Sequence, residues 1–185
     1  MRYALNLLLL FLALGLACVS SSFSAQAQLQ LIDGIENPYP APLLLGISSW
    51  INSPPLKLSD LQGKVILLEF WTSSCPYCRN ATPYINAWYK RYHDQGLLII
   101  GIHSPKNQEE QSRALVKAAV LDSGIHYPVA LDNNFETWES YNSEGWPSFY
   151  LINRKGEVVF VSYGATNYDV IENNIRYLLR LNKSP

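Results

Sequence analysis

The sequence predicts an α/β fold: a central mixed β-sheet flanked by helices on both faces, with an N-terminal β-hairpin extension. Two almost continuous apolar runs, Val65–Trp71 and 97–102, are typical of strands that are buried on both faces. Segments with helical periodicity follow each run, and a β-hairpin signal with a final helix completes the chain. A β-α-β-α start followed by a hairpin and a helix gives a mixed sheet with helices on both sides.

Local signals place the individual elements. The first helix is expected at Pro76–Tyr92, because proline suits the first helical turn and apolar residues follow at helical spacing, with a kink at Pro83. The second helix is expected at 108–121, and the charges of 106–113, which are expected to be mostly solvated, fit a helix face. We expect the remaining elements at 127–131 (strand), 135–141 (helix), 148–152 and 158–163 (strands of a hairpin) and 169–181 (amphipathic helix).

The first 27 residues have the three-part plan of a secretory signal peptide. Arg2 is followed by an apolar run at 7–19, and Ala25 and Ala27 are the small residues that precede a cleavage site. We therefore expect an exported protein of the periplasm or cell envelope. Two alternatives stay open. The segment could remain as a membrane anchor, although 7–19 is shorter than the roughly 20 apolar residues of a span, or the chain could be lipidated at Cys18.

Residues 28–45 contain three prolines and little periodicity, so we interpret them as an extended leader before a domain at 46–182. Within that domain, 47–58 is expected to form a short edge hairpin, because Pro54 and Pro55 are tolerated only at the edge of a sheet. A hydrophobic content of 48% excludes a disordered chain, and a net charge of −1 gives no basic surface for nucleic acid.

The three cysteines are too few for a disulfide-dense scaffold or for a zinc site with four thiolates. Removal of the signal peptide discards Cys18 and leaves Cys75 and Cys78, which can form a disulfide with each other in an oxidising compartment. A buried strand delivers Cys75 to the start of a helix, where unpaired backbone N–H groups and the helix dipole favour a thiolate. Cys78 lies one turn further along and can attack a mixed disulfide formed at Cys75.

Four stretches carry a resemblance to a known family: 67–72 with Cys75 and Cys78, then 101–105, 127–133 and 146–152. The sequence resembles the thioredoxin superfamily. It is most similar to the exported TlpA/ResA-like thiol-disulfide oxidoreductases and, among them, to the periplasmic thioredoxin-like domain of DipZ-type proteins. The resemblance implies a thioredoxin-like fold whose redox group is the Cys75–Cys78 pair, with no cofactor and no metal.

The resemblance also assigns roles to individual residues. Cys75 is expected to be the attacking thiol and Cys78 the resolving one. Pro147 matches the cis-proline that lies opposite the cysteines and offers backbone pairing to a substrate segment. Glu69 matches a buried acid beneath the resolving cysteine, where a raised pKa would let its carboxylate accept the Cys78 proton. The alternative is that Glu69 is a strand-end residue whose side chain reaches water.

Other positions near the cysteines have less specific roles. The substrate groove is expected to involve Trp71, Pro76, Tyr77 and Trp146. Trp146 is bulkier than the residue that usually precedes this proline, so it either narrows the groove or serves as packing. His103 ends the second strand, and it is either a residue that tunes Cys75 electrostatically or a hydrogen-bonded structural histidine.

The function implied by the resemblance is that of an extracytoplasmic thiol-disulfide oxidoreductase, working as a reductant in cytochrome c maturation or thiol homeostasis. Its expected partners are the thiols and disulfides of exported proteins and a membrane thiol-electron transporter, and we expect a monomer. Two alternatives stay open. Thr72, three residues before Cys75, is a feature of peroxiredoxin-like thiol peroxidases, although Leu68 stands where that motif has proline. The domain could also be a non-catalytic binding or chaperone module.

Overall fold

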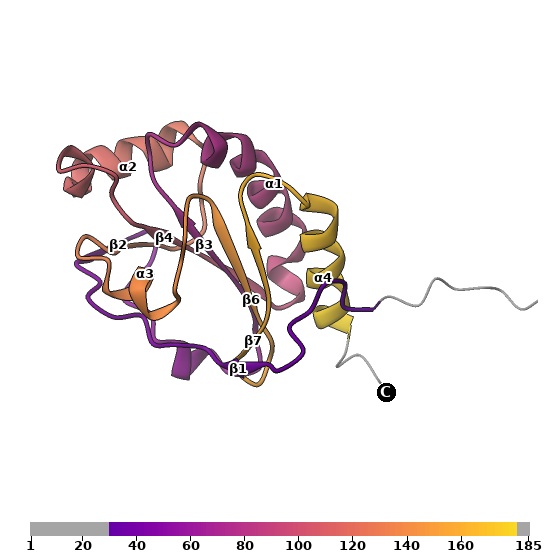
Figure 1. Ribbon diagram of the computed structural model, residues 1–185. Coiled ribbons are helices and arrows are strands. Elements are labelled where there is room, and N and C mark those ends of the chain that lie inside the picture. The colour runs from indigo at the N-terminus through magenta and orange to yellow at the C-terminus, as the bar shows by residue number, and fades with distance from the viewer. Residues whose placement is uncertain (1–29, 181–185) are drawn as a thin grey trace, which may run out of the picture.

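Residues 30–180 are described by the computed structural model, and they form a mixed seven-stranded β-sheet (Figure 1). The strands lie in the order β1 (Tyr39–Pro40), β7 (Glu157–Tyr163), β6 (Ser148–Ile152), β3 (Val65–Trp71), β4 (Leu97–His103), β5 (Val129–Leu131) and β2 (Ser49–Ile51). β3 is parallel to β4, β4 is parallel to β5, and the other neighbours are antiparallel. The predicted α/β class and mixed sheet are therefore confirmed.

The predicted signal peptide at 1–27, with Cys18, lies outside the described residues, as do 28–29 and 181–185. Between residues 30 and 180, no helix is both long and apolar enough to cross a membrane. Cleavage, anchoring and lipidation of the N-terminal segment stay predictions.

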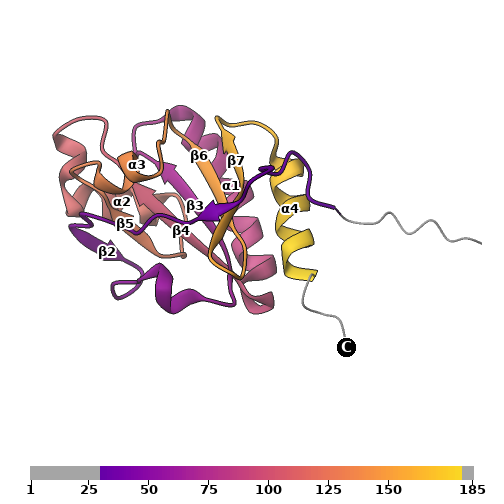
Figure 2. The ribbon, with the colours of Figure 1, turned by 60° about the horizontal axis from the view of Figure 1, so that its bottom comes forward.

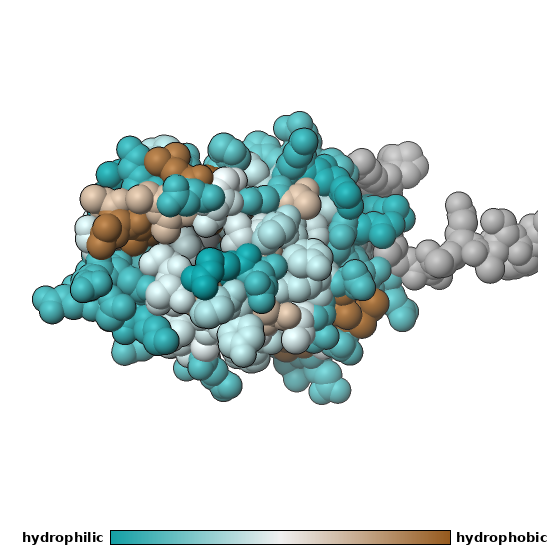
Figure 3. Space-filling view, turned by 90° about the horizontal axis from the view of Figure 1, so that it is seen from above, coloured by the Kyte–Doolittle hydropathy of each residue, from teal (hydrophilic) through white to brown (hydrophobic). Residues whose placement is uncertain are grey.

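One face of the sheet is covered by α1 (Pro76–Tyr92), α2 (Arg113–Asp122) and α4 (Tyr168–Arg180). In Figure 1, α1 and α2 lie above the strands and α4 lies to their right. Val65 and Leu67 of β3 pack in the core beneath these helices. Because side chains alternate along a strand, Glu69 lies on the same face as Leu67 and is buried toward α1. The outer surface over α1 and α2 is mostly hydrophilic, with small hydrophobic patches (Figure 3).

The other face of the sheet is covered by the short helix α3 (Glu136–Ser140) and by the leader. The leader crosses this face from the α4 side to the β2 edge (Figure 2). Its apolar side chains pack on Ile66, Leu68 and Phe70 of β3. Its backbone is also fixed, since the Ile35 N–H donates to the Val159 carbonyl at 2.9 Å. Residues 30–45 are therefore an integral layer of the fold, and they cover the face of the sheet opposite α1.

The predicted N-terminal hairpin is wrong. β2 pairs with β5 at one edge of the sheet, and β1 of the leader pairs with β7 at the opposite edge. The segment after β2 cannot return as a partner strand, because Pro54 and Pro55 lack the N–H groups that a strand ladder needs. Leu58–Leu61 forms a 3-10 turn, η1, in its place.

The second predicted helix is shorter than expected. A 3-10 turn, η3 (Glu109–Gln111), is followed by an extended Ser112, and the helix α2 begins only at Arg113. This break turns Glu110 inward, and the side chain is 6% exposed. The prediction that the charges of 106–113 are mostly solvated agrees with the exposure of these residues, and Glu110 is the buried exception.

The other predicted elements are confirmed with shifts of one or two residues at their ends. α1 has the predicted bounds and continues through Pro83. β4 extends to His103, β5 begins at Val129, and α4 begins at Tyr168. These ends differ because the hydrogen bonds of neighbouring strands and turns decide them, and a local sequence window does not contain those neighbours.

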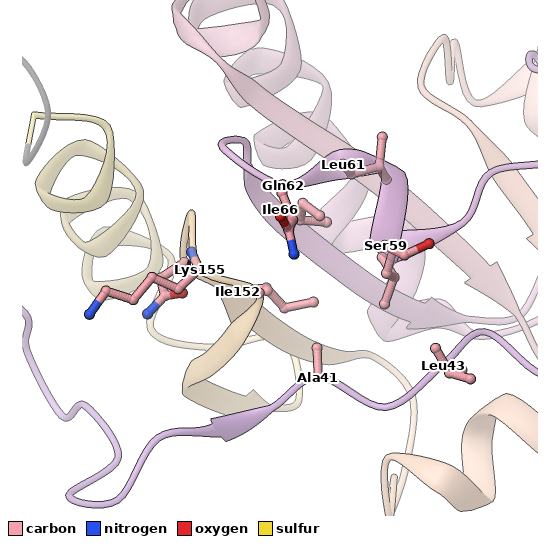
Figure 4. A pocket seen from close by; sticks show the side chains of 11 residues that line it. Ala41, Leu43, Ser59, Leu61, Gln62, Ile66, Ile152 and Lys155 are labelled. Atoms are coloured by element: carbon pink, nitrogen blue, oxygen red, sulfur yellow. Dashed lines mark hydrogen bonds between the residues drawn. The ribbon is translucent and has the colours of Figure 1, made fainter.

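A cavity of about 160 Å³ lies between the leader, η1 and the start of β3. In Figure 4 the side chains of Ala41, Ile66 and Ile152 lie around it, and the Lys155 side chain extends away from it. Ile66 is near the beginning of β3, whereas the cysteines follow the end of that strand. The cavity is therefore separate from the cysteine pair.

Candidate functional site

Cys75 occupies the N-cap of α1, directly after the loop that follows β3. Its backbone is extended there (φ −76°, ψ 116°), and its sulfur accepts a hydrogen bond from the Cys78 N–H at 3.3 Å. Pro76 follows at the first helical position, where a missing N–H costs nothing. The Cys75 sulfur thus replaces the oxygen of an ordinary capping residue, and the N-terminal end of the helix favours negative charge on it.

Cys78 lies one turn into α1 and is buried beneath Cys75, and both side chains are free thiols. Cys78 is 2% exposed, against 8% for Cys75. Burial raises the pKa of the Cys78 thiol, and the nearby Cys75 and the charge of Glu69 raise it further. The two thiols are therefore unequal: Cys75 lies at the helix end and keeps a small exposed area, whereas Cys78 lies deeper and holds its proton.

Pro147 lies beside Cys75, at the start of β6. The Trp146–Pro147 peptide bond is cis, and the Trp146 carbonyl accepts a hydrogen bond from the Cys75 sulfur at 3.7 Å. On its other side, the Pro147 carbonyl accepts from the Gly164 N–H at 2.8 Å. This arrangement brings the backbone at 146–147 next to the accessible sulfur, where an approaching chain would meet both.

Glu69 is buried in β3 and does not reach water, which excludes the alternative of a solvated strand end. The side chain is 1% exposed, and burial raises its pKa to about 8. The Tyr127 hydroxyl donates to Oε2 of Glu69 at 3.0 Å, which partly opposes the effect of burial. Because this carboxyl titrates near neutral pH, it can take or give a proton under ordinary conditions.

Tyr127 is a residue of this site that the sequence analysis did not identify as functional. It precedes β5 and is far from Glu69 in sequence, yet its hydroxyl is fully buried against that carboxyl. A tyrosine before a short apolar strand looks like core packing, and no local pattern shows where its hydroxyl will point. The sequence therefore offered no signal for it.

His103 is fully buried, and its ring meets Trp71 edge-on at 5.0 Å between centroids. Burial lowers the pKa of His103 to about 4, so the ring is uncharged at neutral pH. Among residues 30–180, neither ring nitrogen has a hydrogen-bond partner. The alternative of a hydrogen-bonded structural histidine is therefore not seen among the described residues, and an electrostatic effect of His103 on Cys75 stays a prediction.

A groove of about 550 Å³ is lined by residues near Cys75 and Pro147 in sequence, although neither of these two residues lines it. Tyr77 and Trp146, two of the predicted groove residues, line it together with residues of the loop after β7, and its role in binding a substrate stays a prediction. Its lining residues are Tyr77, Glu144, Gly145, Trp146, Tyr163, Gly164, Ala165 and Thr166. Two of the four predicted groove residues lie elsewhere: Pro76 is exposed at the helix end, and Trp71 is 4% exposed and packed against His103.

Glu110 is a second residue of the site that the sequence analysis missed. Its carboxylate accepts hydrogen bonds from the loop at 72–74 that leads to Cys75. Burial by itself would raise its pKa, but the hydrogen bonds from Ser74, Thr72 and Lys106 outweigh burial and lower the pKa to about 2. Glu110 is therefore a buried carboxylate that stays ionised.

Within residues 30–180, the His, Cys, Asp and Glu side chains form no group of three or more that could hold a metal ion. The site itself offers two thiols, a helix end that favours a thiolate, and one buried carboxyl whose pKa is raised to about 8. Absence of a cofactor from the reaction stays a prediction.

Comparison with known proteins agrees with this geometry. The sequence profile described as Redoxin matches residues 52–179. Protein DipZ of Mycobacterium tuberculosis is 42% identical over 142 residues, which are 75% of this chain and 20% of that protein. Thioredoxin-like protein SkfH of Bacillus subtilis is 31% identical over 120 residues, which are 65% of this chain and 83% of that one. The chain thus spans only a fifth of the length of its DipZ relative.

Solved structures show the same fold. The crystal structure of a thiol-disulfide isomerase from Corynebacterium glutamicum superposes with a TM-score of 0.68 and 31% identity. The match covers 75% of this chain and 96% of that one. A thioredoxin-like superfamily protein superposes with a TM-score of 0.71 and 27% identity over 79% of this chain. The fold is therefore thioredoxin-like, as the sequence resemblance implied.

Proposed function

Because the chain belongs to the Redoxin family and has a thioredoxin-like fold, we propose that it is a thiol-disulfide oxidoreductase whose redox group is the Cys75–Cys78 pair. One observation carries this proposal: the Cys75 sulfur caps α1 beside the Trp146 carbonyl, with the Cys78 thiol buried one turn below. A binding module needs neither a thiol that caps a helix nor a second thiol one turn below it. The names of the DipZ, SkfH and isomerase relatives are consistent with this activity.

The reaction begins with attack by the Cys75 thiolate on a disulfide of a client protein. A new S–S bond forms between Cys75 and the client, and the second client sulfur leaves as a thiolate. The helix end stabilises the attacking charge before the reaction. In the second step the Cys78 sulfur attacks Cys75, the client leaves with both sulfurs reduced, and the two cysteines become a disulfide. Two electrons have then passed from the protein to the client.

Glu69 takes the proton of Cys78 in the second step. The Cys78 thiol holds its proton, because burial and the charge of Glu69 raise its pKa, so attack needs an acceptor. The ionised form of Glu69 can serve as that acceptor, and its pKa of about 8 lets it release the proton again. Running the same steps backwards, the protonated Glu69 returns a proton to Cys78 when the disulfide is reduced.

The client segment binds along the groove beside Pro147. Backbone atoms at 146–147 lie next to the Cys75 sulfur and are positioned to pair with an extended chain. Tyr77 and Tyr163, which are 64% and 45% exposed, line the groove and provide aromatic surface for that chain. The groove therefore suits an extended peptide with an apolar side chain next to its cysteine.

The physiological setting that fits best is the space outside the cytoplasmic membrane. The signal-like segment at 1–27 and the relation to DipZ support export to the periplasm or cell envelope. There the protein would act as a reductant of exported proteins, in cytochrome c maturation or thiol homeostasis, with electrons from a membrane thiol transporter. It would work as a monomer, without further cofactor, metal or nucleic acid.

Insulin reduction tests the proposed activity. With a dithiol as electron source, the purified protein should accelerate precipitation of the insulin B chain, and Cys75→Ser should abolish that acceleration. Cys78→Ser should instead accumulate mixed disulfides between Cys75 and client proteins. Full activity of Cys75→Ser would refute the mechanism. Turnover of hydrogen peroxide without any disulfide reduction would favour a peroxidase instead.

A further inference from the structure

The carboxylate of Glu110 accepts four hydrogen bonds from two different segments. Its Oε1 accepts from the Ser73 hydroxyl at 3.1 Å and from the Ser74 N–H at 2.9 Å. Its Oε2 accepts from the Thr72 hydroxyl and from the Lys106 N–H, the latter at 2.7 Å. Three of the four donors therefore belong to the loop at 72–74, which is all that separates β3 from Cys75.

This loop decides where the Cys75 sulfur lies. Cys75 is fixed on its C-terminal side by α1, where the Arg79 N–H donates to its carbonyl at 3.2 Å. On its N-terminal side, the Cys75 N–H donates to the Thr72 carbonyl at 3.3 Å, so a shift of the loop would carry Cys75 with it. In the observed position the sulfur contacts both the Cys78 N–H and the Trp146 carbonyl.

The hydrogen-bond pattern requires a carboxylate. Each oxygen of Glu110 accepts from one backbone N–H, Ser74 on one side and Lys106 on the other. A backbone N–H can only donate, and an amide side chain has only one accepting atom. Glutamine would therefore place its NH₂ group against one of these two N–H groups. A buried anion is costly unless it is fully hydrogen-bonded, and these four donors meet that condition.

We propose that Glu110 is a positioning residue for Cys75: its carboxylate anchors the 72–74 loop and thereby holds the Cys75 sulfur at the N-terminal end of α1. Glu110 does not contact the reacting sulfur and takes no proton. This inference rests on the proposed function only in treating Cys75 as the nucleophile.

The direction in which the reaction rate of Cys75 changes when Glu110 is replaced distinguishes a positioning role from a purely electrostatic role. A negative charge near Cys75 disfavours its thiolate, so loss of that charge alone would make Cys75 react faster. Loss of the anchor lets the sulfur leave the helix end, so Cys75 would react more slowly. If Glu110 only filled space, its replacement would leave the reaction rate of Cys75 unchanged in a protein that still folds.

The test is the alkylation rate of Cys75 in the full chain with iodoacetamide, followed by mass spectrometry that assigns each adduct to its cysteine. We expect Glu110→Gln to slow alkylation of Cys75 by about tenfold. The matched control is Glu109→Gln, which makes the same change at the exposed neighbouring position and should stay within about twofold of the wild type. A wild-type or faster rate for Glu110→Gln overturns the proposal.

A second measurement is the redox equilibrium of the cysteine pair with glutathione. It depends on the position of the Cys75 sulfur and not on packing alone. Without the anchor, the reduced form loses its stabilisation at the helix end, so the equilibrium with glutathione should shift by about threefold or more toward the disulfide form. An unchanged equilibrium constant in a folded Glu110→Gln protein contradicts the proposal. Neither readout uses a client protein, so failure of the wild type to reduce insulin would refute the proposed function and leave this test intact.

Thr72→Val keeps the proposal testable if Glu110→Gln does not fold. This variant removes one donor from the 72–74 loop, and the Ser73, Ser74 and Lys106 donors remain. We expect a smaller decrease, about threefold, in the alkylation rate of Cys75. An unchanged rate in Thr72→Val overturns the proposal.

Discussion

The Tyr127 hydroxyl donates a 3.0 Å hydrogen bond to Oε2 of Glu69, and both side chains are completely buried on the face of the sheet that α1 covers. One carboxyl oxygen is thereby occupied, and the carboxyl is fixed in orientation. The negative charge of Glu69 acts on Cys78, which places these three groups in one buried cluster. Four predictions follow from this cluster and from the layer that the leader forms.

Glu69→Gln should slow the second chemical step and leave the first unchanged, because the amide cannot accept the Cys78 proton. Reaction with Ellman's reagent separates the steps: attack by Cys75 releases one thionitrobenzoate, and attack by Cys78 releases another. We expect the second release to be slower by about 100-fold, a usual value for loss of a proton acceptor. Cys78→Ser identifies this phase by removing it.

The matched control for Glu69→Gln is Glu139→Gln, at an exposed position of α3 outside the site. Both releases should keep their wild-type rates in this control. Equal rates of the second release in the wild type and Glu69→Gln would show that another group takes the Cys78 proton.

Tyr127→Phe should move the pH dependence of the second step upward. The hydrogen bond from Tyr127 lowers the pKa of Glu69, so its loss leaves burial unopposed and raises that pKa above about 8. We expect the pH midpoint of the second release to rise by roughly one unit. Tyr89→Phe, in a ring that packs edge-on against Tyr127, is the control and should leave the midpoint in place. A midpoint that does not move would exclude a role of Tyr127 in setting the Glu69 pKa.

The contribution of Glu69 to the free energy of unfolding should fall as the pH rises from about 4.5 to about 8. The folded protein keeps the Glu69 proton up to a pKa of about 8, whereas the unfolded chain releases it near the ordinary value of 4.5. In this window the unfolded state binds fewer protons than the native state, so stability decreases with pH. The full shift corresponds to about 4–5 kcal/mol.

Glu69→Gln should remove this contribution, because an amide does not titrate. Urea unfolding of the wild type and the variant, measured in steps across this pH range, gives the difference directly. The stability of the variant relative to the wild type should increase with pH. Curves that run parallel across the whole range would contradict a raised pKa at Glu69.

Asn174→Ala should release the first part of the leader. The buried Asn174 amide accepts from the Ile32 N–H at 2.8 Å and donates to the Ile32 carbonyl at 2.8 Å, so one side chain pairs with both backbone groups. We expect a loss of about 2 kcal/mol in the free energy of unfolding and faster hydrogen exchange at 32–35. Asn173→Ala, which removes an exposed hydrogen bond to the Gln30 carbonyl and a long one, at 3.5 Å, to Oδ1 of Asn174, should have a smaller effect. Unchanged exchange in Asn174→Ala would show that the leader is held by apolar packing alone.

The sequence by itself determined the parts of the site that depend on near neighbours. The apolar run of β3, the proline at the first position of α1 and the periodicity of that helix place Cys75 at a helix N-terminus, and the structure has the same bounds. The spacing of the two cysteines puts Cys78 one turn below. Periodicity shows that an element is buried and which of its faces is buried, so these features follow from a short window of sequence.

Only the tertiary structure decided which distant residues complete the site. Tyr127 is 58 positions from Glu69, and Glu110 is 38 positions from Thr72. Glu110 lies among polar and charged residues that look solvated, and its burial depends on which loop docks against it. The leader shows the same limit, since its prolines indicate extended chain without indicating the sheet edge that it joins. Local sequence encodes whether a group prefers burial, whereas its hydrogen-bond partners are set by the packing of elements that are remote along the chain.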